Sequence, residues 1–89
     1  MYTVYILFSL KKQRFYIGFT SDQITERIRK HNSNHRGFTG KQGDWELFYQ
    51  EQYVDKADAM KREKEIKGWK SRKMIERLIA SGVGSKHPD

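Results

Sequence analysis

The sequence predicts a single α+β domain, a small three-stranded antiparallel sheet with helices packed on it in the order β-β-α-β-α-α. Two short runs, residues 2–8 and 14–19, alternate apolar and polar side chains around a tight turn, which is typical of a β-hairpin. Residues 45–53 alternate well enough to form a third strand. Before and after this third run, apolar residues recur at helical spacing. With 89 residues, the chain has room for one hydrophobic core and not for two.

The hairpin determines where two tyrosines point. Each run has one apolar face, formed by Val4, Ile6 and Phe8 and by Phe15, Ile17 and Phe19. Burying both faces on one side of the sheet requires a register that places Tyr5 and Tyr16 together on the other side, and a slip of one residue would separate them. Gly18 then follows where the backbone must pass closely. The pair indicates a built site; the alternative is that tyrosine is simply common in strands.

Capping residues set the expected helix boundaries. Residues 20–23, with the sequence Thr-Ser-Asp-Gln, have the form of a capping box, so a first helix is expected to run from there to about His31 or Asn32. Asp55 is the expected N-cap of a second helix that reaches about Lys67, where Gly68 can terminate it. Ser71 is expected to cap a third helix, with Gly82 past its end.

The remaining segments mark the limits of the domain. An apolar stripe identifies the third helix and consists of Met74, Ile75, Leu78 and Ile79. Residues 32–44 form a long loop of a kind that is usually functional or mobile. We expect the domain to span residues 1–82 and residues 83–89 to form a flexible C-terminal tail.

The first helix places two polar residues where apolar ones are expected. Arg27 and His31 share a stripe with Ile24 and Ile28, so they lie toward the core and not on the open face. An unpaired buried charge is costly, so both residues need partners. The alternative is that Arg27 extends its charge to solvent and His31 caps the end of the helix.

The second helix repeats this pattern with a carboxylate. Glu63 falls between Ala59 and Ile66 on the inward stripe, where it is expected to meet a cation. That cation is either Arg27, in an ion pair that helix geometry alone slightly favours, or a divalent metal ion bound through oxygen.

Charge and composition narrow the classes of function. The 18 Lys and Arg residues outnumber the 11 Asp and Glu residues, and the net charge of +7 favours a polyanionic partner, nucleic acid before a membrane. No transmembrane-length run and no cysteine is present, so we expect a cytoplasmic protein without disulfides. A cluster expected to contact DNA comprises Lys61, Lys64, Lys67, Trp69, Lys70, Arg72 and Lys73. For Trp69 itself, burial in the core is the favoured alternative.

In this order, the residues resemble the GIY-YIG nuclease superfamily, in particular its short stand-alone bacterial members. The second half of the family motif is present at residues 16–18 (Tyr-Ile-Gly), whereas residues 3–5 (Thr-Val-Tyr) keep the tyrosine of the first half and have threonine in place of glycine. Residues 26–32 resemble the arginine helix of the family, which ends in His-Asn. Residues 59–63 resemble the segment that presents its metal-binding glutamate. The resemblance covers residues 2–80.

The resemblance implies a DNA endonuclease that hydrolyses phosphodiester bonds with one Mg²⁺ or Mn²⁺ ion, in DNA repair or recombination. Tyr16, with Tyr5 beside it, would orient or deprotonate the attacking water. Arg27 would stabilise charge on the phosphoryl oxygens, His31 would assist proton transfer or contact the phosphate, and Glu63 would hold the metal. A phenol is a poor base at its ordinary pKa of about 10, so it needs the nearby cations, Arg27 and the metal, to lower that pKa.

Two other classes of function remain open at this point. One is a non-catalytic nucleic-acid-binding module, and the other is an accessory protein of a repair complex. A binding module has no need of Glu63, whose charge opposes phosphate unless a metal intervenes. DNA binding is expected to be sequence-nonspecific or structure-specific, because no base-reading helix is evident, and a protein partner or a homodimer is left open.

Overall fold

The computed structural model describes residues 1–33 and 43–81, and within them three strands and three helices follow the expected order. The strands are β1 (Tyr2–Ser9), β2 (Arg14–Thr20) and β3 (Trp45–Tyr53), and the helices are α1 (Ile24–Ser33), α2 (Lys56–Trp69) and α3 (Arg72–Ser81). Both strand pairs are antiparallel, and the order β2-β1-β3 places β1 in the middle. The predicted α+β class is confirmed. Much of the expected loop (34–42) and the expected tail with Gly82 lie outside the described residues.

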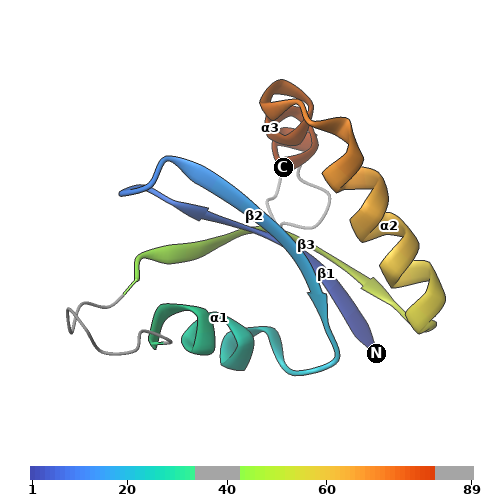
Figure 1. Ribbon diagram of the computed structural model, residues 1–89. Coiled ribbons are helices and arrows are strands. Elements are labelled where there is room, and N and C mark those ends of the chain that lie inside the picture. The colour runs from blue at the N-terminus through green and yellow to red at the C-terminus, as the bar shows by residue number, and fades with distance from the viewer. Residues whose placement is uncertain (34–42, 82–89) are drawn as a thin grey trace.

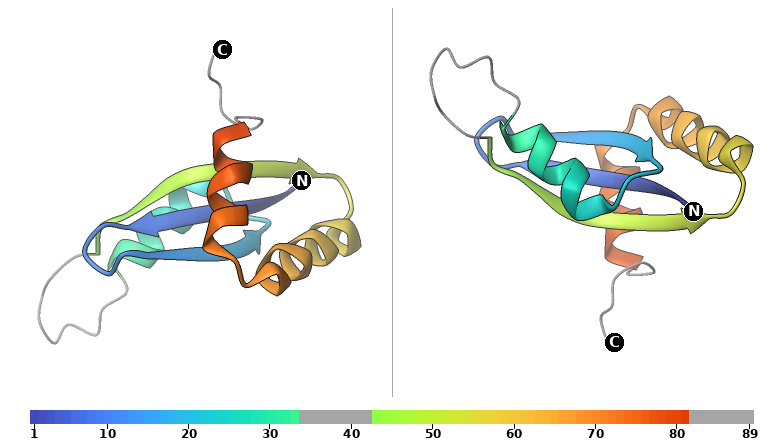
Figure 2. Two further views of the ribbon diagram at one scale, coloured as in Figure 1. Left: turned by 90° about the horizontal axis from the view of Figure 1, so that it is seen from above. Right: turned by 90° about the horizontal axis from the view of Figure 1, so that it is seen from below.

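The helices cover both faces of the sheet. α1 lies against one face, and α2 and α3 lie on the other (Figure 1). Seen from above, α3 crosses the strands and α2 lies on the β2 side, and seen from below, α1 lies across the opposite face (Figure 2). Within the described ranges, no helix has the length and apolar character needed to cross a membrane.

The register of β1 and β2 sorts their side chains onto the two faces as predicted. Tyr5 pairs with Gly18 and Leu7 pairs with Tyr16, so the two tyrosines are diagonal neighbours on the face that α1 covers. We call this the tyrosine face. The other face holds the hydrophobic core against α2 and α3, whose buried members are Val4, Ile6, Ile17, Tyr49, Ala59, Ile66 and Ile75. The prediction that one register both buries the apolar residues and joins the tyrosines is confirmed.

β3 interrupts its alternation at a β-bulge. Tyr49 pairs with Ile6 and Leu47 pairs with Leu7, which leaves Phe48 as an extra residue without a partner on β1. Because of this extra residue, Leu47 lies on the tyrosine face and Tyr49 lies on the core face. Strict alternation would have put both on one face.

The turn between β1 and β2 is held from outside the hairpin. Asp44 accepts hydrogen bonds from the hydroxyl of Ser9 (2.5 Å) and from the backbone N–H of Lys11 (2.8 Å). Within the turn, Gln13 takes the left-handed conformation (φ 54°), and its N–H donates to the C=O of Ser9 (2.7 Å). The start of β3 is therefore tied to the hairpin turn.

The expected start of α1 is wrong by a few residues. Thr20 belongs to β2, and its hydroxyl accepts a hydrogen bond from the N–H of Asp22 (3.0 Å), so the capping box does not form. The helix begins at Ile24, and the C=O of Gln23 accepts a hydrogen bond from the N–H of Arg27 (3.1 Å). Thr20 is unavailable as a cap because its backbone is still in the sheet.

The other helix signals are partly confirmed. Asp55 is the N-cap residue of α2, without a side-chain cap bond. Gly68 does not end α2, which continues to its C-cap at Lys70 in the left-handed conformation (φ 49°). Ser71 caps α3 as predicted, because its hydroxyl accepts from the N–H of Met74 (3.2 Å). Met74 itself is exposed, since one side of α3 faces the sheet and other residues fill that side.

Candidate active site

Tyr5 lies at the centre of the tyrosine face. Its side chain is 0% exposed and lies over Gly18, its partner on β2. A Cβ atom at position 18 would come within 2.8 Å of the Tyr5 hydroxyl oxygen and 3.0 Å of Cε2 of Tyr16. The absence of a side chain at Gly18 therefore makes room for both phenols.

α1 brings an arginine and a histidine to this buried phenol. Nε of Arg27 donates a hydrogen bond to the Tyr5 hydroxyl (3.2 Å), and Nε2 of His31 lies 3.4 Å from the same oxygen. Both are half-buried, so the prediction that they lie toward the core is confirmed. Arg27 has no ion-pair partner within the described residues, which leaves its terminal nitrogens available to an anion.

Burial controls the protonation of this group. It raises the pKa of Tyr5, and the hydrogen bond and charge of Arg27 offset this rise only in part. Burial, together with the charge of Arg27, lowers the pKa of His31. At neutral pH, a neutral Tyr5 can therefore donate its proton to a neutral imidazole while it accepts from Arg27. Arg27 thus lowers the phenol pKa as expected, but burial outweighs it at Tyr5, which is a positioning residue without access to water.

Tyr16 is the phenol of this group that faces solvent. It is 36% exposed, and its ring centroid lies 6.2 Å from that of Tyr5 and 4.7 Å from that of His31. Trp45 completes the aromatic group, with ring centroids 6.2 Å from Tyr16 and 6.3 Å from His31. The sequence analysis missed Trp45. The bulge at Phe48 puts Trp45 and Tyr49 on opposite faces of the sheet, and the alternation of apolar and polar residues gives no sign of that bulge. The only signal for Trp45 was an aromatic residue at the start of a strand.

Asn32 fixes the end of α1 to the start of β3. Its Oδ1 accepts a hydrogen bond from the N–H of Trp45 (2.8 Å), and its Nδ2 donates to the Trp45 C=O (3.1 Å). Its own backbone C=O accepts from the N–H of Gly43 (2.9 Å). These bonds hold the neighbouring His31 in place beside Trp45.

Glu63, on α2, lies close enough to the tyrosine face for its charge to affect Tyr5. Its side chain is 19% exposed, and its negative charge contributes to the raised pKa of Tyr5. Its ion pair is with Lys67, one turn along the helix (Oε2 to Nζ 3.2 Å). The pairing with Arg27 that helix geometry favoured is therefore wrong, because Arg27 is held by Tyr5 instead.

Glu63 is the carboxylate that the resemblance assigns to the metal. Among residues 1–33 and 43–81, no group of three or more His, Cys, Asp or Glu side chains could hold a metal ion. Mg²⁺, in contrast, is commonly bound through one or two carboxylates and keeps several waters. Glu63 is half-buried and already attracts the ammonium of Lys67. A single half-buried carboxylate is the kind of ligand that such an ion takes, and the metal-holding role of Glu63 stays a prediction.

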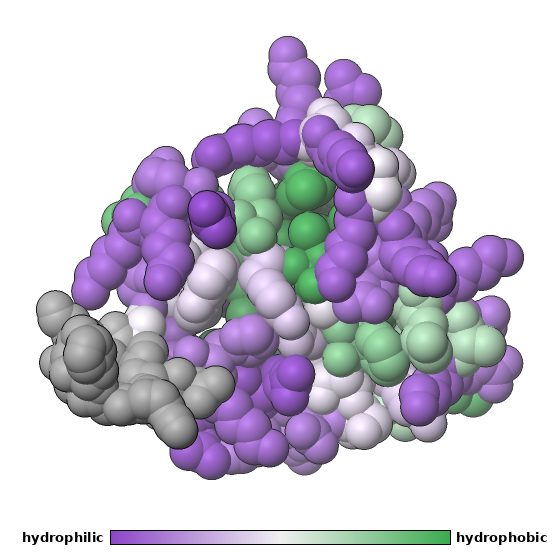
Figure 3. Space-filling view, in the orientation of Figure 1, coloured by the Kyte–Doolittle hydropathy of each residue, from purple (hydrophilic) through white to green (hydrophobic). Residues whose placement is uncertain are grey.

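The basic cluster expected around Trp69 is divided among several surfaces. Lys67, Lys70 and Arg72 line a hollow of about 450 Å³ between β2 and the corner where α2 meets α3, which we call the corner hollow. Figure 3 shows a hydrophobic floor on this face of the molecule, surrounded by hydrophilic side chains. Lys61 lines a different hollow, between β3 and α2. Members of the cluster therefore line two separate hollows.

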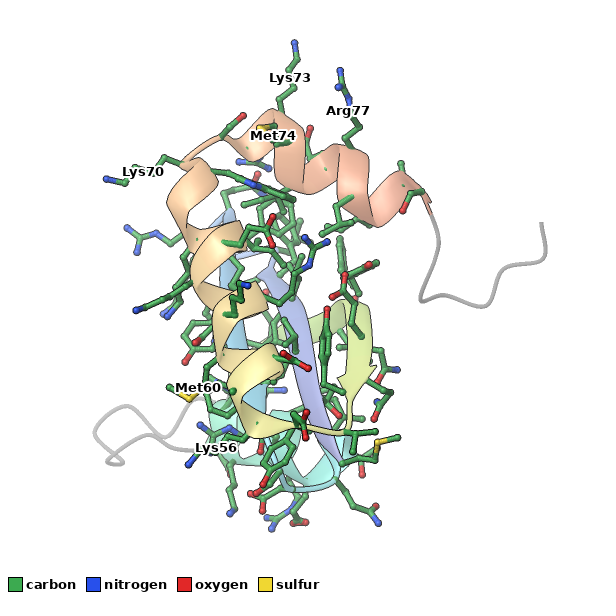
Figure 4. The ribbon with its side chains drawn as sticks, turned by 90° about the vertical axis from the view of Figure 1, so that its right-hand side faces the viewer. Lys56, Met60, Lys70, Lys73, Met74 and Arg77 are labelled. Carbon is green, nitrogen blue, oxygen red and sulfur yellow. The ribbon has the colours of Figure 1, made fainter. Side chains whose placement is uncertain are left out.

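The remaining members of the cluster lie elsewhere. Lys73 projects from the outer face of α3 (Figure 4), and Lys64 is exposed on α2. Trp69 packs against the hydrophobic core, as its alternative interpretation predicted, with the guanidinium of Arg62 5.7 Å from the centre of its ring.

An ion pair that the sequence analysis missed connects α2 to β3. Arg62 donates to both carboxylate oxygens of Glu51, from Nε (3.0 Å) and from Nη2 (3.1 Å), and the two side chains are only 23% and 15% exposed. Glu51 also accepts from the hydroxyls of Tyr49 and Tyr53, and burial together with this carboxylate raises the pKa of Tyr53 to about 12. This cluster fixes the rotation of α2 and with it the direction of Glu63.

Comparisons with known proteins agree with this arrangement. The family model described as the GIY-YIG catalytic domain matches residues 1–76. The chain is similar to the UPF0213 protein SSP2268 of Staphylococcus saprophyticus subsp. saprophyticus, with 36% identity over 80 residues that cover 89% of this chain and 94% of that protein. It is also similar to the solution NMR structure of the UPF0213 protein BH0048 from Bacillus halodurans, with 34% identity, a TM-score of 0.57, and coverage of 96% of this chain and 88% of that one. Because the family match includes the whole tyrosine face together with Glu63, the chain belongs to the GIY-YIG catalytic domain family, a family of nucleases.

Proposed function

We propose that this protein is a divalent-metal-dependent endonuclease that hydrolyses phosphodiester bonds of DNA. The observation that carries the proposal is that one buried phenol, Tyr5, holds a guanidinium and an imidazole beside the exposed phenol of Tyr16. Hydrolysis of a phosphodiester needs groups that bind the phosphoryl oxygens, that orient water and accept its proton, and that stabilise the developing charge. The residues of this site suit each of these tasks.

Each side chain has a chemistry that fits one part of the reaction. The terminal nitrogens of Arg27 suit two oxygens of one phosphate, because a guanidinium binds such groups through paired hydrogen bonds. Tyr16, the exposed phenol, orients the attacking water, and His31 beside it contacts the phosphate through Nδ1–H, because its Nε2 accepts from Tyr5. Glu63 would hold Mg²⁺ or Mn²⁺, which when bound supplies stabilisation of negative charge on the reacting oxygens.

The charge of the chain supports DNA as the substrate. A net charge of +7 favours contacts with phosphates, so we propose that DNA is selected by its structure and not by its base sequence, in repair or recombination. The absence of cysteine supports a cytoplasmic location, where disulfides do not persist.

A non-catalytic nucleic-acid-binding module is the second candidate. The ion pair between Glu63 and Lys67 favours it, because in such a module the lysine would neutralise the carboxylate and no metal would be needed. The two candidate functions predict different effects when the charge of Glu63 is removed: an endonuclease loses cleavage, whereas a binding module has no cleavage to lose.

The test is a cleavage assay on branched, nicked, single-stranded and plasmid DNA with Mg²⁺, with Mn²⁺ and with EDTA. Glu63→Gln keeps the size of the side chain and removes its charge. This variant should lose cleavage, bind DNA at least as well as the parent, and change in stability by no more than about 0.5 kcal/mol, the value of an i,i+4 pair. Glu65→Gln is the matched control, because Glu65 lies on the same helix and also pairs with a cation, Arg62 (3.1 Å).

The control variant should cut DNA at the parental rate. If Glu63→Gln also cuts at the parental rate, or if the parent cuts equally well in EDTA, Glu63 is not a metal ligand. If the parent binds these DNAs and cuts none of them, the binding module is the better description.

A further inference from the structure

The corner hollow combines an apolar floor with a cationic rim. The floor consists of Phe15, Ile17, Ile66 and Ile75. The rim carries four cationic side chains and no carboxylate, and they are Arg14, Lys67, Lys70 and Arg72. Arg14 and Lys70 have no ion-pair partner within the described residues. Such a surface suits a polymer that alternates apolar sugars with anionic phosphates.

The backbone around the hollow is unusual at two points. Both non-glycine residues with positive φ in the described chain, Gln13 (54°) and Lys70 (49°), line this hollow. The left-handed conformation is unfavourable for a lysine, and position 70 is the C-cap of α2, next to the position where glycine is usual. Gly68 lies only two residues earlier, inside the helix, where nothing requires a glycine. A lysine at a position better suited to glycine is an outlier of the kind that accompanies functional sites.

The corner hollow is continuous with the tyrosine face through two shared residues. Tyr16 lines the hollow and also contacts His31, and Lys67 lines the hollow and also pairs with Glu63. Figure 4 shows Lys70 projecting from the corner of α2 and α3 in a different direction from Lys73, which projects from the outer face of α3. The tyrosine face and the hollow therefore adjoin each other at Tyr16 and Lys67.

We propose that the corner hollow binds the sugar–phosphate backbone of the DNA strand being cleaved, on one side of the scissile phosphate. This inference rests on the proposed function, because it takes the scissile phosphate to lie at the tyrosine face. Arg14 and Lys70 bind backbone phosphates, and the apolar floor contacts the sugars between them. The hollow around Lys61 does not serve this purpose, because the carboxylates of Asp58 and Glu65 line it.

The test measures the affinity for a fluorescent branched DNA across a salt series in EDTA, which stops cleavage. Lys70→Gly and Arg14→Gln each remove one cation from the corner hollow, and Lys56→Gln, the matched control, removes an exposed cation at the other end of α2. Each hollow variant should weaken binding and lower the slope of log affinity against log salt by about 0.9, the value for one phosphate contact on duplex DNA. Lys56→Gln should keep the parental slope. Lys70→Gly should also raise the Tm, because glycine relieves the left-handed conformation.

Four outcomes overturn one proposal or the other. A parent that cuts DNA, with parental slopes in both Lys70→Gly and Arg14→Gln, overturns this inference alone. An equal change of slope in Lys56→Gln also overturns this inference. A parent that binds through the hollow and cuts no DNA overturns the proposed function, and the hollow is then the DNA-binding surface of a non-catalytic module. A parent that binds no DNA overturns both.

Discussion

Replacing Gly18 by alanine tests whether the close approach of Tyr5 to β2 positions the site. The added Cβ would lie 2.8 Å from the Tyr5 hydroxyl oxygen and 3.0 Å from its Cζ, whereas ordinary contacts begin near 3.4 Å. The phenol would have to move by about 0.6 Å to restore an ordinary contact. Because Tyr5 is completely buried, that movement must displace its neighbours.

The movement is large compared with the hydrogen bonds at this phenol. The distances from the Tyr5 hydroxyl to Arg27 (3.2 Å) and to His31 (3.4 Å) are already long, so a shift of about 0.6 Å away from either partner breaks that hydrogen bond. Overpacking of this kind costs about 1–3 kcal/mol, and each kcal/mol lowers the Tm of a domain of this size by about 4–8 °C. Cleavage should fall by up to about 100-fold, because a displacement of about 1 Å can cost that much.

Thermal melts and cleavage rates of the parent and two variants test whether the contact between Tyr5 and Gly18 positions the site. Gly68→Ala is the matched control, because a Cβ at position 68 meets nothing within 4 Å and the residue lies inside α2. The control should gain about 0.5–1 kcal/mol of stability and keep its cleavage rate. If Gly18→Ala melts and cuts as the parent does, Tyr5 is not held against Gly18, and the positioning argument is refuted.

His31 should make folding stability depend on pH, because burial and the charge of Arg27 lower its pKa in the folded state. Below about pH 6.5 the unfolded chain binds the proton before the folded chain does, so the stability that the neutral imidazole contributes is complete above that pH and is lost as the pH falls toward the folded pKa. His31→Gln should therefore reduce the decline in Tm between about pH 7.5 and 5. Equal declines in the parent and the variant would contradict the assignment of this pH dependence to His31. Arg62→Leu leaves the Glu51 carboxylate half-buried without its cation, which should cost about 3 kcal/mol in urea unfolding. Arg29→Leu, which removes the exposed ion pair between Arg29 and Glu26 on α1, should cost much less stability, because solvent screens both charges. Equal losses in these two variants would show that the Glu51 pair does not hold α2.

The parts of the site that depend on one element at a time were predictable. The period of two in the hairpin placed Tyr5 and Tyr16 on one face, because the apolar side chains of both strands had to face the core. The helical period placed Arg27 and His31 on one side of α1, and both reach the same phenol. In each case, the side of an element on which a residue lies follows from local geometry.

The parts that depend on distant segments were not predictable. The alternation of residues in β3 gives no sign that Phe48 is the extra residue. The sequence therefore could not show that Trp45 and Tyr49 lie on opposite faces of the sheet. The spacing of α2 placed Glu63 toward the core, but its partner depends on the rotation of the helix, which Arg62 fixes through β3. A periodic pattern shows which face of a helix or strand a residue occupies. It does not show which charged residue of another element lies close to that face.

The bulge at Phe48 divides β3 into two halves that serve opposite sides of the sheet. The half before it supplies Trp45 to the tyrosine face, and the half after it supplies Glu51 to α2. Insertion or deletion of one residue at this point reverses which side chains the first half presents, while its pairing with β1 continues. Related sequences that gain or lose one residue at this position can therefore change the aromatic side chains that line the site and keep the same hydrophobic core.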